Sequence, residues 1–408
     1  MTSLSGVRVV DLTGSVAGPF ATQILGDLGA DVIKIERLGS GDDTRSWGPP
    51  FWHGESATFL SLNRNKRSLS VDLKSDRGLA LVRELLDTAD VFIQNIRPGS
   101  AARLGLGYEE LSATNAGIIV CDISGFGPRG EMKDDVAYDP LLQAFGGLMS
   151  LTGEHGGVPV RIPASILDQG TALWSVIGVL AALRERDRTG RGALVQTSLL
   201  GTALQWLPSQ ITGYLADGTV PRRLGSGTVG IAPYQAFATA DGHIVIAAGN
   251  DRLYARLCAV LGRPELVHDE RFLDNPSRVR NREELVAELE KSTTTLTSAE
   301  LAARLSDVDV PVGVIHTLDQ VVAHPQVAAL GLIQPQDHPR IPDFRTIASA
   351  VEIDGSLPVV RHVPPLLGEH TEELLAELGY DADAVAGFER DGVVAGPVSG
   401  IPRKVATP

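Results

Sequence analysis

Short β-branched runs alternate with helical periodicity in the first half of the chain. Residues 7–12 form a short β-branched run typical of a strand, and residues 31–36 indicate a second strand. Between them, Phe20, Ile24 and Leu28 lie at helical spacing, which predicts a helix over residues 19–28. A strand, a helix and a strand within about thirty residues form a βαβ unit, so this pattern predicts a parallel sheet.

The same alternation continues along the chain. It predicts strands at residues 70–73, 91–93, 118–123 and 194–197, and helices at residues 77–89 and 166–186. The first part of the chain is therefore expected to form an α/β domain.

The pattern changes around residues 214–242, where glycine and proline cluster. Residues 233–246 predict a hairpin that turns at Asp241-Gly242, and helical segments follow. A strand is expected at residues 310–315, and Thr317-x-x-Gln320 resembles a capping box that opens another helix. We expect a second, smaller domain at about residues 225–330. After it, the sequence predicts strands within residues 343–363 and a helix over residues 372–378.

Composition and charge narrow the function. The 408 residues suggest two domains, and the 43% hydrophobic and 21% charged shares are ordinary for a soluble protein. A net charge of −14 without a basic run argues against nucleic-acid binding. The N-terminus shows no signal-peptide pattern, and the apolar stretch at residues 172–183 is well short of a membrane span. Cys121 and Cys258 are far apart, which fits a reducing compartment, so we expect a cytoplasmic protein without a membrane partner.

Glycine-rich segments offer two candidate ligand sites. Residues 225–230 match G-x-G-x-x-G, but no strand precedes them and Pro233 follows closely, so we favour a mobile loop near a ligand over a dinucleotide site. The turn at residues 14–18 occupies the position where nucleotide phosphates often bind, with Glu36 ending the next strand; a tight turn with a surface glutamate is the alternative. The histidines and cysteines show no metal-binding spacing, so no metal is expected.

Basic residues gather in the N-terminal third of the chain. Each could be a solvated surface charge, but several follow predicted strands, where open α/β sheets bind ligands, so together they could hold a phosphorylated nucleotide. The set comprises Lys34, Arg37, Arg45, Arg64, Lys66, Arg67, Lys74, Arg97 and Arg103.

Asp168 is an unusual residue because it opens a long apolar helix among uncharged neighbours. One interpretation is a carboxylate stabilised by the helix dipole. The other is a carboxylate with a functional role.

Taken together, these segments resemble the class III CoA-transferase family, which includes formyl-CoA transferase, crotonobetaine–carnitine CoA-transferase and α-methylacyl-CoA racemase. The resemblance covers nearly the whole chain, and its specificity lies in the order and spacing of the segments. They are Val9–Leu12 with Ala17–Pro19, Leu28–Glu36, Asn65–Ser68, Ser124–Gly127, Tyr138-Asp139, Asp168, Thr189–Gly192, Pro233-Tyr234-x-x-Phe237 and Leu367–Thr371.

The resemblance implies a fold and an assembly. A Rossmann-like, parallel-sheet α/β large domain would be built from both chain ends, residues 1–200 and 331–408. Residues 201–224 would link it to a smaller α+β middle domain at residues 225–330, and two chains would form an interlocked homodimer.

The resemblance also implies site residues. Asp168 falls on the catalytic nucleophile, and glycines of a substrate loop fall on Gly225, Gly227 and Gly230, followed by Tyr234. The expected contacts with coenzyme A are Val16, Ala17, Arg37, Val71, Asp72, Leu73, Lys74, Asn95, Ile96, Arg97, Arg103, Val136, Ala137, Tyr138 and Asp139.

The implied reaction moves CoA from an acyl-CoA to a small carboxylic acid through mixed-anhydride and aspartyl-CoA thioester intermediates on Asp168. The competing function is a racemase, which exchanges the α-proton of an acyl-CoA with a His-Asp pair. This chain has Tyr138-Asp139 there, and tyrosine, with an ordinary pKa near 10, is a poor base at neutral pH. A protein that only binds acyl-CoA is the third possibility, and the presence of Asp168 argues against it.

Overall fold

The computed structural model describes residues 3–397, which divide into two compact units. The larger unit contains the chain up to Gly146, Pro163–Pro208 and the chain from Gln326 onward. The smaller unit contains Gly147–Ile162 and Ser209–Pro325. The larger unit is thus built from both ends of the chain. Residues 147–162 leave it for the smaller unit, and the stretch expected to be a linker contains helix α10 (Pro208–Asp217).

A seven-stranded sheet forms the core of the larger unit, in the order β14-β5-β2-β1-β6-β7-β8. Neighbouring strands are parallel except at the edge, where β14 pairs antiparallel with β5. The strands are β1 (Arg8–Leu12), β2 (Asp31–Glu36), β5 (Lys66–Val71), β6 (Val91–Gln94), β7 (Ile119–Ser124), β8 (Leu194–Ser198) and β14 (Val394–Ala395). The parallel α/β arrangement expected from the sequence is therefore confirmed.

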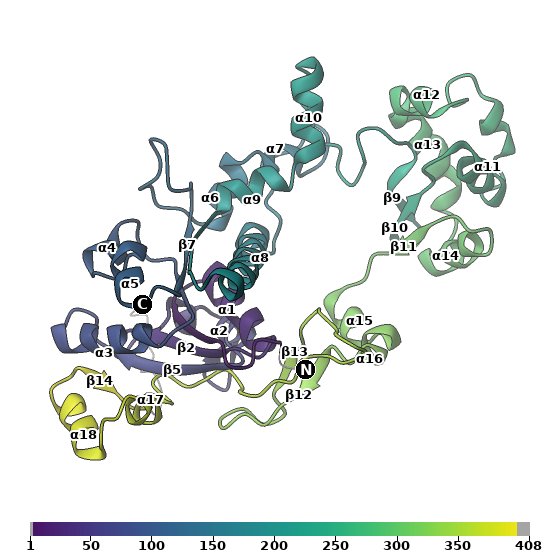
Figure 1. Ribbon diagram of the computed structural model, residues 1–408. Coiled ribbons are helices and arrows are strands. Elements are labelled where there is room, and N and C mark those ends of the chain that lie inside the picture. The colour runs from purple at the N-terminus through teal and green to yellow at the C-terminus, as the bar shows by residue number, and fades with distance from the viewer. Residues whose placement is uncertain (1–2, 398–408) are drawn as a thin grey trace, which may run out of the picture. The chain divides into compact units, whose positions relative to one another are not determined.

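Helices cover both faces of this sheet, because each face carries alternate apolar side chains. Figure 1 shows α3 (Asp76–Asp87) and α17 (Thr371–Glu377) on one side of β2 and β5, with α1 (Ala17–Asp27) and α8 (Ile166–Thr189) on the other. On the α3 face, Val10, Ile33 and Phe92 pack with helix residues such as Leu85 in one buried cluster. Helices α5 (Tyr108–Thr114) and α18 (Ala382–Arg390) complete that cluster.

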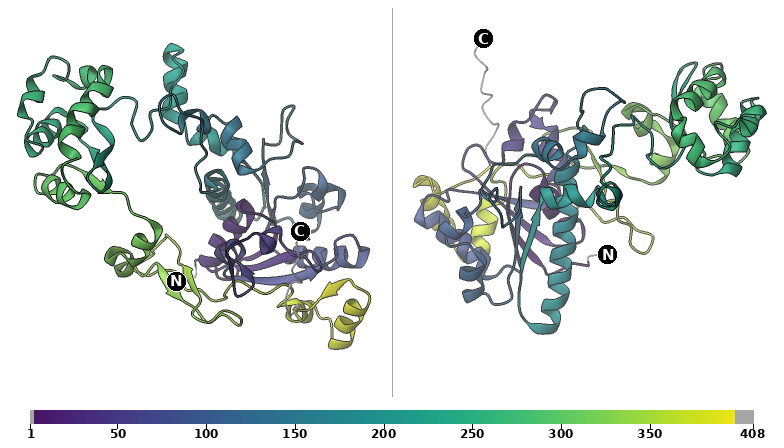
Figure 2. Two further views of the ribbon diagram at one scale, coloured as in Figure 1. Left: turned by 180° about the vertical axis from the view of Figure 1, so that it is seen from behind. Right: turned by 90° about the horizontal axis from the view of Figure 1, so that it is seen from above.

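Helix α8 is 24 residues long, more than the apolar stretch suggested. Among residues 3–397 it is the one helix long and apolar enough to cross a membrane by length and composition. A core helix meets the same criteria, and α8 packs as one, against α1, β7 and β8 (Figure 1 and Figure 2). A Cβ atom on Gly178 would lie 2.6 Å from Val195 of β8, so this glycine allows α8 to approach the sheet closely.

The remaining elements of the larger unit are short. They are η1 (Asp43–Ser46), β3 (Phe51–Trp52), β4 (Glu55–Ser56), α2 (Ala57–Leu62), α4 (Ser100–Arg103), α6 (Asp139–Phe145), α9 (Leu199–Gln205), β12 (Ile333–Pro335) and β13 (Arg345–Ile347), with α16 (Pro325–Ala329) at the unit boundary.

The smaller unit has its own three-stranded antiparallel sheet, in the order β11-β10-β9, with a separate apolar core. Strands β9 (Tyr234–Thr239) and β10 (Gly242–Ala247) form the expected hairpin, and β11 (Val312–Val314) joins its edge. The helices are α7 (Leu148–Leu151), α10, α11 (Asp251–Val260), η2 (Pro264–His268), α12 (Asn275–Arg280), α13 (Arg282–Thr293), α14 (Ser298–Ser306) and α15 (Leu318–Ala323). The capping box of Thr317 and Gln320 is present at the start of α15.

Two local predictions need correction. The strand expected at residues 70–73 is β5, which begins at Lys66 and ends at Val71, because its polar residues pair inside the structure. The tail between residues 343 and 363 contains the short strand β13 and an isolated bridge rather than a series of strands. Prolines at 342, 358, 364 and 365 remove backbone donors there, and Asp343 and Asp354 adopt positive φ angles.

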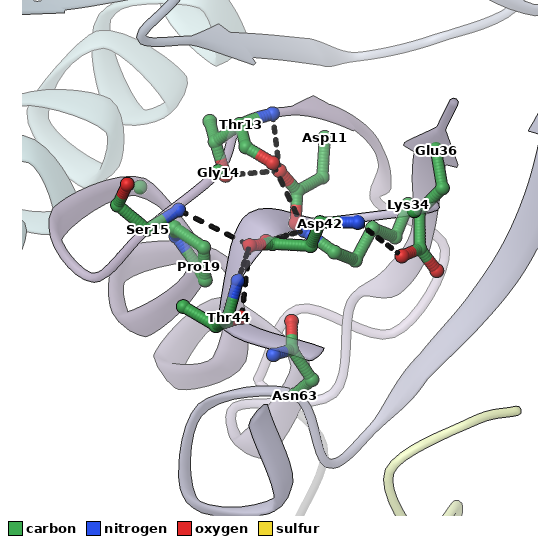
Figure 3. Close-up of polar contacts among 12 residues, drawn as sticks. Asp11, Thr13, Gly14, Ser15, Pro19, Lys34, Glu36, Asp42, Thr44 and Asn63 are labelled. Atoms are coloured by element: carbon green, nitrogen blue, oxygen red, sulfur yellow. Dashed lines mark hydrogen bonds and ion pairs between the residues drawn. The ribbon is translucent and has the colours of Figure 1, made fainter. Parts of the chain in front are cut away.

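The sheet face under α1 buries a set of charges, several of which Figure 3 shows. Asp11 of β1 accepts hydrogen bonds from the backbone and hydroxyl of Thr13, the hydroxyl of Thr22 and the ammonium of Lys66. Burial favours the neutral acid, but the neighbouring ammonium groups of Lys66 and Lys34 bring the pKa of Asp11 below its ordinary value.

We therefore expect Asp11→Asn to lower the free energy of unfolding by about 3–5 kcal/mol, the range for breaking a buried ion pair. The variant keeps the side-chain shape but leaves two buried ammonium groups without this counter-charge. Urea unfolding at neutral pH measures the effect. A loss below about 1 kcal/mol would show that the pairing contributes no more than a surface salt bridge.

Candidate active site

The order of the strands in the seven-stranded sheet indicates where a ligand would bind. From β1, the chain adds β2 and β5 on one side and then β6, β7 and β8 on the other. Ligands of open α/β sheets bind at such a switch, outside the carboxyl ends of the two central strands. Here Gly14 follows β1 and Asn95 follows β6. The Gly14 N–H donates to Asn95 Oδ1 over 2.9 Å, and Asn95 Nδ2 donates to the Gly14 carbonyl over 2.8 Å.

The predicted contact residues lie at this same edge of the sheet. Val16 and Ala17 start α1 after β1, and Arg37 follows β2. Val71 is the last residue of β5, and Asp72, Leu73 and Lys74 follow it. Asn95, Ile96 and Arg97 follow β6, and Arg103 is the last residue of α4. After β7, Gly125 contacts Ala137 so closely that a Cβ on Gly125 would lie 2.0 Å from the alanine methyl. Parallel strands present their carboxyl ends on one side, so these residues gather along one edge.

Arg37, Lys74, Arg97 and Arg103 have exposed side chains at this edge. Arg37 pairs with the exposed Asp43 and donates to the Gly41 carbonyl, while Arg103 donates to the Ser100 hydroxyl over 2.7 Å. Exposed pairs of this kind contribute little stability, so a phosphate could replace their present partners at low cost.

The other basic residues do not belong to such a cluster. Lys34 pairs with Asp42, Arg45 with Glu36, Arg64 with Asp27, Lys66 with Asp11, and Arg67 with Asp31, Glu373 and Glu377. All five are buried, so the expectation that they could help to hold a phosphorylated nucleotide is wrong. Glu36, considered as a surface residue, is likewise buried.

Asp168 lies in the first turn of α8 and is partly buried. Helix α8 is antiparallel to the strands it precedes and follows, so its first turn belongs to the carboxyl edge of the sheet. The backbone N–H groups of Leu167 and Asp168 donate to Asp139 Oδ2, over 2.7 and 3.2 Å. Asp139 is itself buried, and its Oδ1 accepts a hydrogen bond from Gln143 Nε2 over 2.6 Å. Asp139 thus caps the helix that carries Asp168.

This arrangement perturbs the charge of Asp168. Burial, and then the neighbouring Asp139 carboxylate, raise the pKa of Asp168 from 3.8 to about 7. Within residues 3–397, no side chain donates a hydrogen bond to the Asp168 carboxylate or forms an ion pair with it. An ionised carboxylate with so little stabilisation is a better nucleophile than one in water. The helix dipole alone, the alternative interpretation, would lower the pKa instead.

Asp139 was expected as a ligand contact, and its role as a cap was missed. The Tyr-Asp-Pro sequence does signal a helix start, because proline is favoured in the first turn. That the carboxylate reaches a second helix, almost thirty residues away, depends on the tertiary fold. Tyr138 precedes it and is 56% exposed, and the nearby Val136 is 68% exposed.

The glycine-rich loop belongs to the smaller unit. The Gly225 N–H donates to the Gly153 carbonyl over 2.9 Å, and Gly225 has a φ of +57°, which favours glycine. The Arg282 guanidinium donates to the carbonyls of Thr228 and Ile231. Gly227 and Gly230 complete the loop, and Tyr234 opens β9 with 39% exposure. No helix follows the motif, which rules out a dinucleotide fingerprint.

Within the described residues 3–397, no group of three or more histidine, cysteine, aspartate or glutamate side chains could hold a metal ion. At the carboxyl edge, Asp168 is the carboxylate whose pKa is raised to about 7.

Known proteins are similar to this chain over most of its length. Residues 4–371 match the family model described as CoA-transferase family III. The chain is 41% identical to succinyl-CoA:glutarate CoA-transferase of Mus musculus, over 97% of this chain and 91% of that protein. It is 40% identical to succinate–glutarate CoA-transferase of Agrobacterium fabrum, over 92% and 95%. A crystal structure of a CAIB/BAIF family protein from Brucella suis shares 40% identity and a TM-score of 0.84, covering 92% of this chain and 99% of that one.

The raised pKa of Asp168 has a consequence for stability. Between pH 4 and 7 the folded protein retains a proton on Asp168 that the unfolded chain releases, so the free energy of unfolding falls as pH rises through this window. Asp168→Asn removes this penalty, and we expect it to be more stable than the parent protein at pH 8, by about 1–3 kcal/mol after allowance for partial exposure.

Urea unfolding of both proteins from pH 4.5 to 8 measures this difference, which should shrink toward the acidic end. In an Asp139→Asn background the gain should be smaller, because the neighbouring negative charge is gone. A difference that is constant with pH would contradict the raised pKa.

Proposed function

The chain belongs to CoA-transferase family III, and from this membership we propose that it moves CoA from succinyl-CoA to a small dicarboxylic acid, with Asp168 as the covalent nucleophile. The observation that supports the proposal most strongly is the position of the Asp168 carboxylate. It has a raised pKa and lies in the first turn of α8, which Asp139 caps. The relatives named above support the substrate class, since their names specify succinate and glutarate.

The first half of the reaction transfers CoA to Asp168 and releases the donor acid. Ionised Asp168 attacks the thioester carbonyl carbon of the acyl-CoA. The carbon–sulfur bond breaks, which gives a mixed anhydride on Asp168 and the CoA thiolate. The thiolate then attacks the Asp168 carbonyl of the anhydride, which releases the donor acid as a carboxylate and leaves an aspartyl-CoA thioester. Asp168 must be deprotonated for the first attack, so the fraction of the enzyme that can react grows as pH rises through about 7.

The second half reverses these steps with another acid. The acceptor carboxylate attacks the aspartyl-CoA carbonyl, CoA thiolate leaves, and the thiolate attacks the acceptor carbonyl of the new anhydride. Asp168 departs as a carboxylate and the acceptor leaves as its CoA thioester. Each step exchanges one activated acyl bond for another, so the overall reaction needs no ATP.

The exposed cations at the carboxyl edge are the proposed contacts for the phosphates of CoA. Arg37 and Arg103 would bind them by charge-assisted hydrogen bonds, and Lys74 and Arg97 lie beside them in the same series of loops. Backbone N–H groups of Val16 and Ala17 would add neutral donors from the turn after β1. The glycine-rich loop and Tyr234 are proposed to contact the acid substrate.

We also propose that two chains form the active assembly. Helices α6 and α8 of a single chain expose large apolar side chains, including Leu141, Phe145, Leu173 and Ile177, each 45–56% exposed. Apolar surface of this kind is typical of a protein interface. A homodimer would bury it.

The test is a transfer assay. Purified protein with succinyl-CoA and glutarate should produce glutaryl-CoA and succinate, read by mass spectrometry, and Asp168→Ala should lower the turnover by several orders of magnitude. Asp27→Ala, which changes a carboxylate remote from the proposed site, controls for loss of folded protein. Retention of most activity by Asp168→Ala would return Asp168 to the role of a helix-terminal carboxylate.

The racemase alternative makes a different prediction in heavy water. A racemase would introduce deuterium at the α-carbon of a 2-methylacyl-CoA, whereas we expect no enzyme-dependent exchange because Tyr138 stands where the base would be. Rapid exchange that Asp168→Asn abolishes would overturn the transferase assignment.

A further inference from the structure

The turn from Thr13 to Val16 is held by side chains from three other segments of the chain. Lys34 of β2 donates its ammonium to the Thr13 carbonyl over 2.9 Å. Asn95, after β6, forms the reciprocal pair with Gly14. Asp42, in the loop after β2, accepts the Ser15 N–H at Oδ1 over 3.3 Å. Figure 3 shows Asp42 between Lys34 on one side and Ser15 with Thr44 on the other.

Asp42 uses both of its oxygens. Oδ1 also accepts the backbone N–H and hydroxyl of Thr44 over 2.9 and 2.8 Å, and Oδ2 lies 2.8 Å from Lys34 Nζ. The side chains of Asp42 and Lys34 are fully inaccessible to solvent. Burial opposes ionisation of Asp42, but the Lys34 ammonium and the Thr44 hydrogen bonds lower its pKa to about 2. The carboxylate is therefore fully ionised at neutral pH, and it links β2, its following loop and the turn after β1.

The turn needs such support because of its backbone. Ser15 has a φ of +64°, in the left-handed region that a residue with a Cβ atom rarely adopts. This conformation costs energy and persists only where the surroundings impose it. It also sets the direction of the next residues, because Val16 is the N-cap of α1 and has no side-chain capping bond. The conformation of the turn therefore sets the direction of the first N–H groups of α1.

We propose that the buried Lys34–Asp42 pair is the positioning element of the acyl-CoA site. It holds Ser15 in the left-handed conformation and so directs the N–H groups of Val16 and Ala17 toward the phosphate-bearing part of CoA. The pair does not touch the reacting atoms, and it acts only through the turn. This inference rests on the proposed function, since it assigns a role to the turn in binding CoA.

The structure contains a matched control for this pair. Asp27, at the end of α1 opposite the turn, pairs with Arg64 and accepts a hydrogen bond from Asn65 over 2.8 Å. Asp27 and Arg64 are as deeply buried as Asp42, and within residues 3–397 neither side chain forms a hydrogen bond or ion pair with an expected CoA contact. Loss of either carboxylate leaves a buried cation unpaired, so both variants should lose similar stability. Only the loss of Asp42 should move the turn.

The experiment compares free CoA binding by calorimetry for the full-length wild-type protein, Asp42→Ala, Asp42→Asn and Asp27→Ala, at a temperature where all four are folded. Asp42→Ala should raise the Kd for CoA at least about 10-fold, because the hydrogen bonds to a charged acceptor that fix the turn are lost. Asp42→Asn retains an acceptor oxygen for Ser15 and should restore part of this affinity. Asp27→Ala should stay within about twofold of wild type. In the transfer assay, Asp42→Ala should raise KM for acyl-CoA and leave kcat nearly unchanged.

Equal loss of CoA affinity in Asp42→Ala and Asp27→Ala would overturn the proposal, because general loosening would then explain both. Unchanged affinity in Asp42→Ala would overturn it as well. If wild-type protein does not bind CoA, the proposed function fails first. Amide hydrogen exchange then tests the positioning separately: exchange at Val16 and Ala17 should become faster in Asp42→Ala and not in Asp27→Ala, and equal exchange in the two variants would contradict the role of Asp42.

Discussion

The carboxyl edge of the sheet depends on the pairing of charges that the fold has buried. Lys34 and Lys66 have no access to solvent, and their ammonium groups are stabilised by Asp11, Asp42 and the backbone carbonyls of Thr13 and Pro19. A buried cation without its partner costs several kcal/mol, so few arrangements of the loops after β1 and β2 are compatible with these residues. The turn that follows β1 is therefore fixed by electrostatics rather than by its own sequence.

Burial also determines the ionisation of Asp168, but here no cation of the described residues compensates for it. Its carboxylate is partly buried beside another carboxylate, and the described part of the chain supplies it with no cation, so its pKa rises to about 7. The protein loses stability there at neutral pH, and the carboxylate gains reactivity. Asp139 connects both consequences, since it stabilises the start of α8 by capping it and destabilises the charge that α8 carries. In the proposed reaction, these two effects of Asp139 place the Asp168 carboxylate in a fixed position and leave it weakly stabilised, so that it can attack a thioester.

Periodicity predicted much of this fold, and the family resemblance supplied the candidate site residues. The β-branched residues at 31–36 and 118–123 are typical of strands, and both segments form strands of the parallel sheet where expected. The partners of polar residues could not be predicted in this way. Lys34 was expected to be a surface charge or a ligand of a phosphorylated nucleotide, but it is buried against Asp42, which comes from a loop whose path depends on the whole sheet. The contact of Asp139 with α8 and the membership of residues 147–162 in the smaller unit depend on tertiary structure in the same way.

The most direct measurement is the mass of the peptide that contains Asp168 after the enzyme is mixed with succinyl-CoA and quenched with acid within one turnover. A nucleophilic Asp168 predicts a peptide that carries CoA as a thioester, and treatment with hydroxylamine should convert that side chain to a hydroxamate. Asp168→Asn should show neither product. Turnover at the normal rate with Asp168 unmodified would contradict the covalent role assigned to this residue.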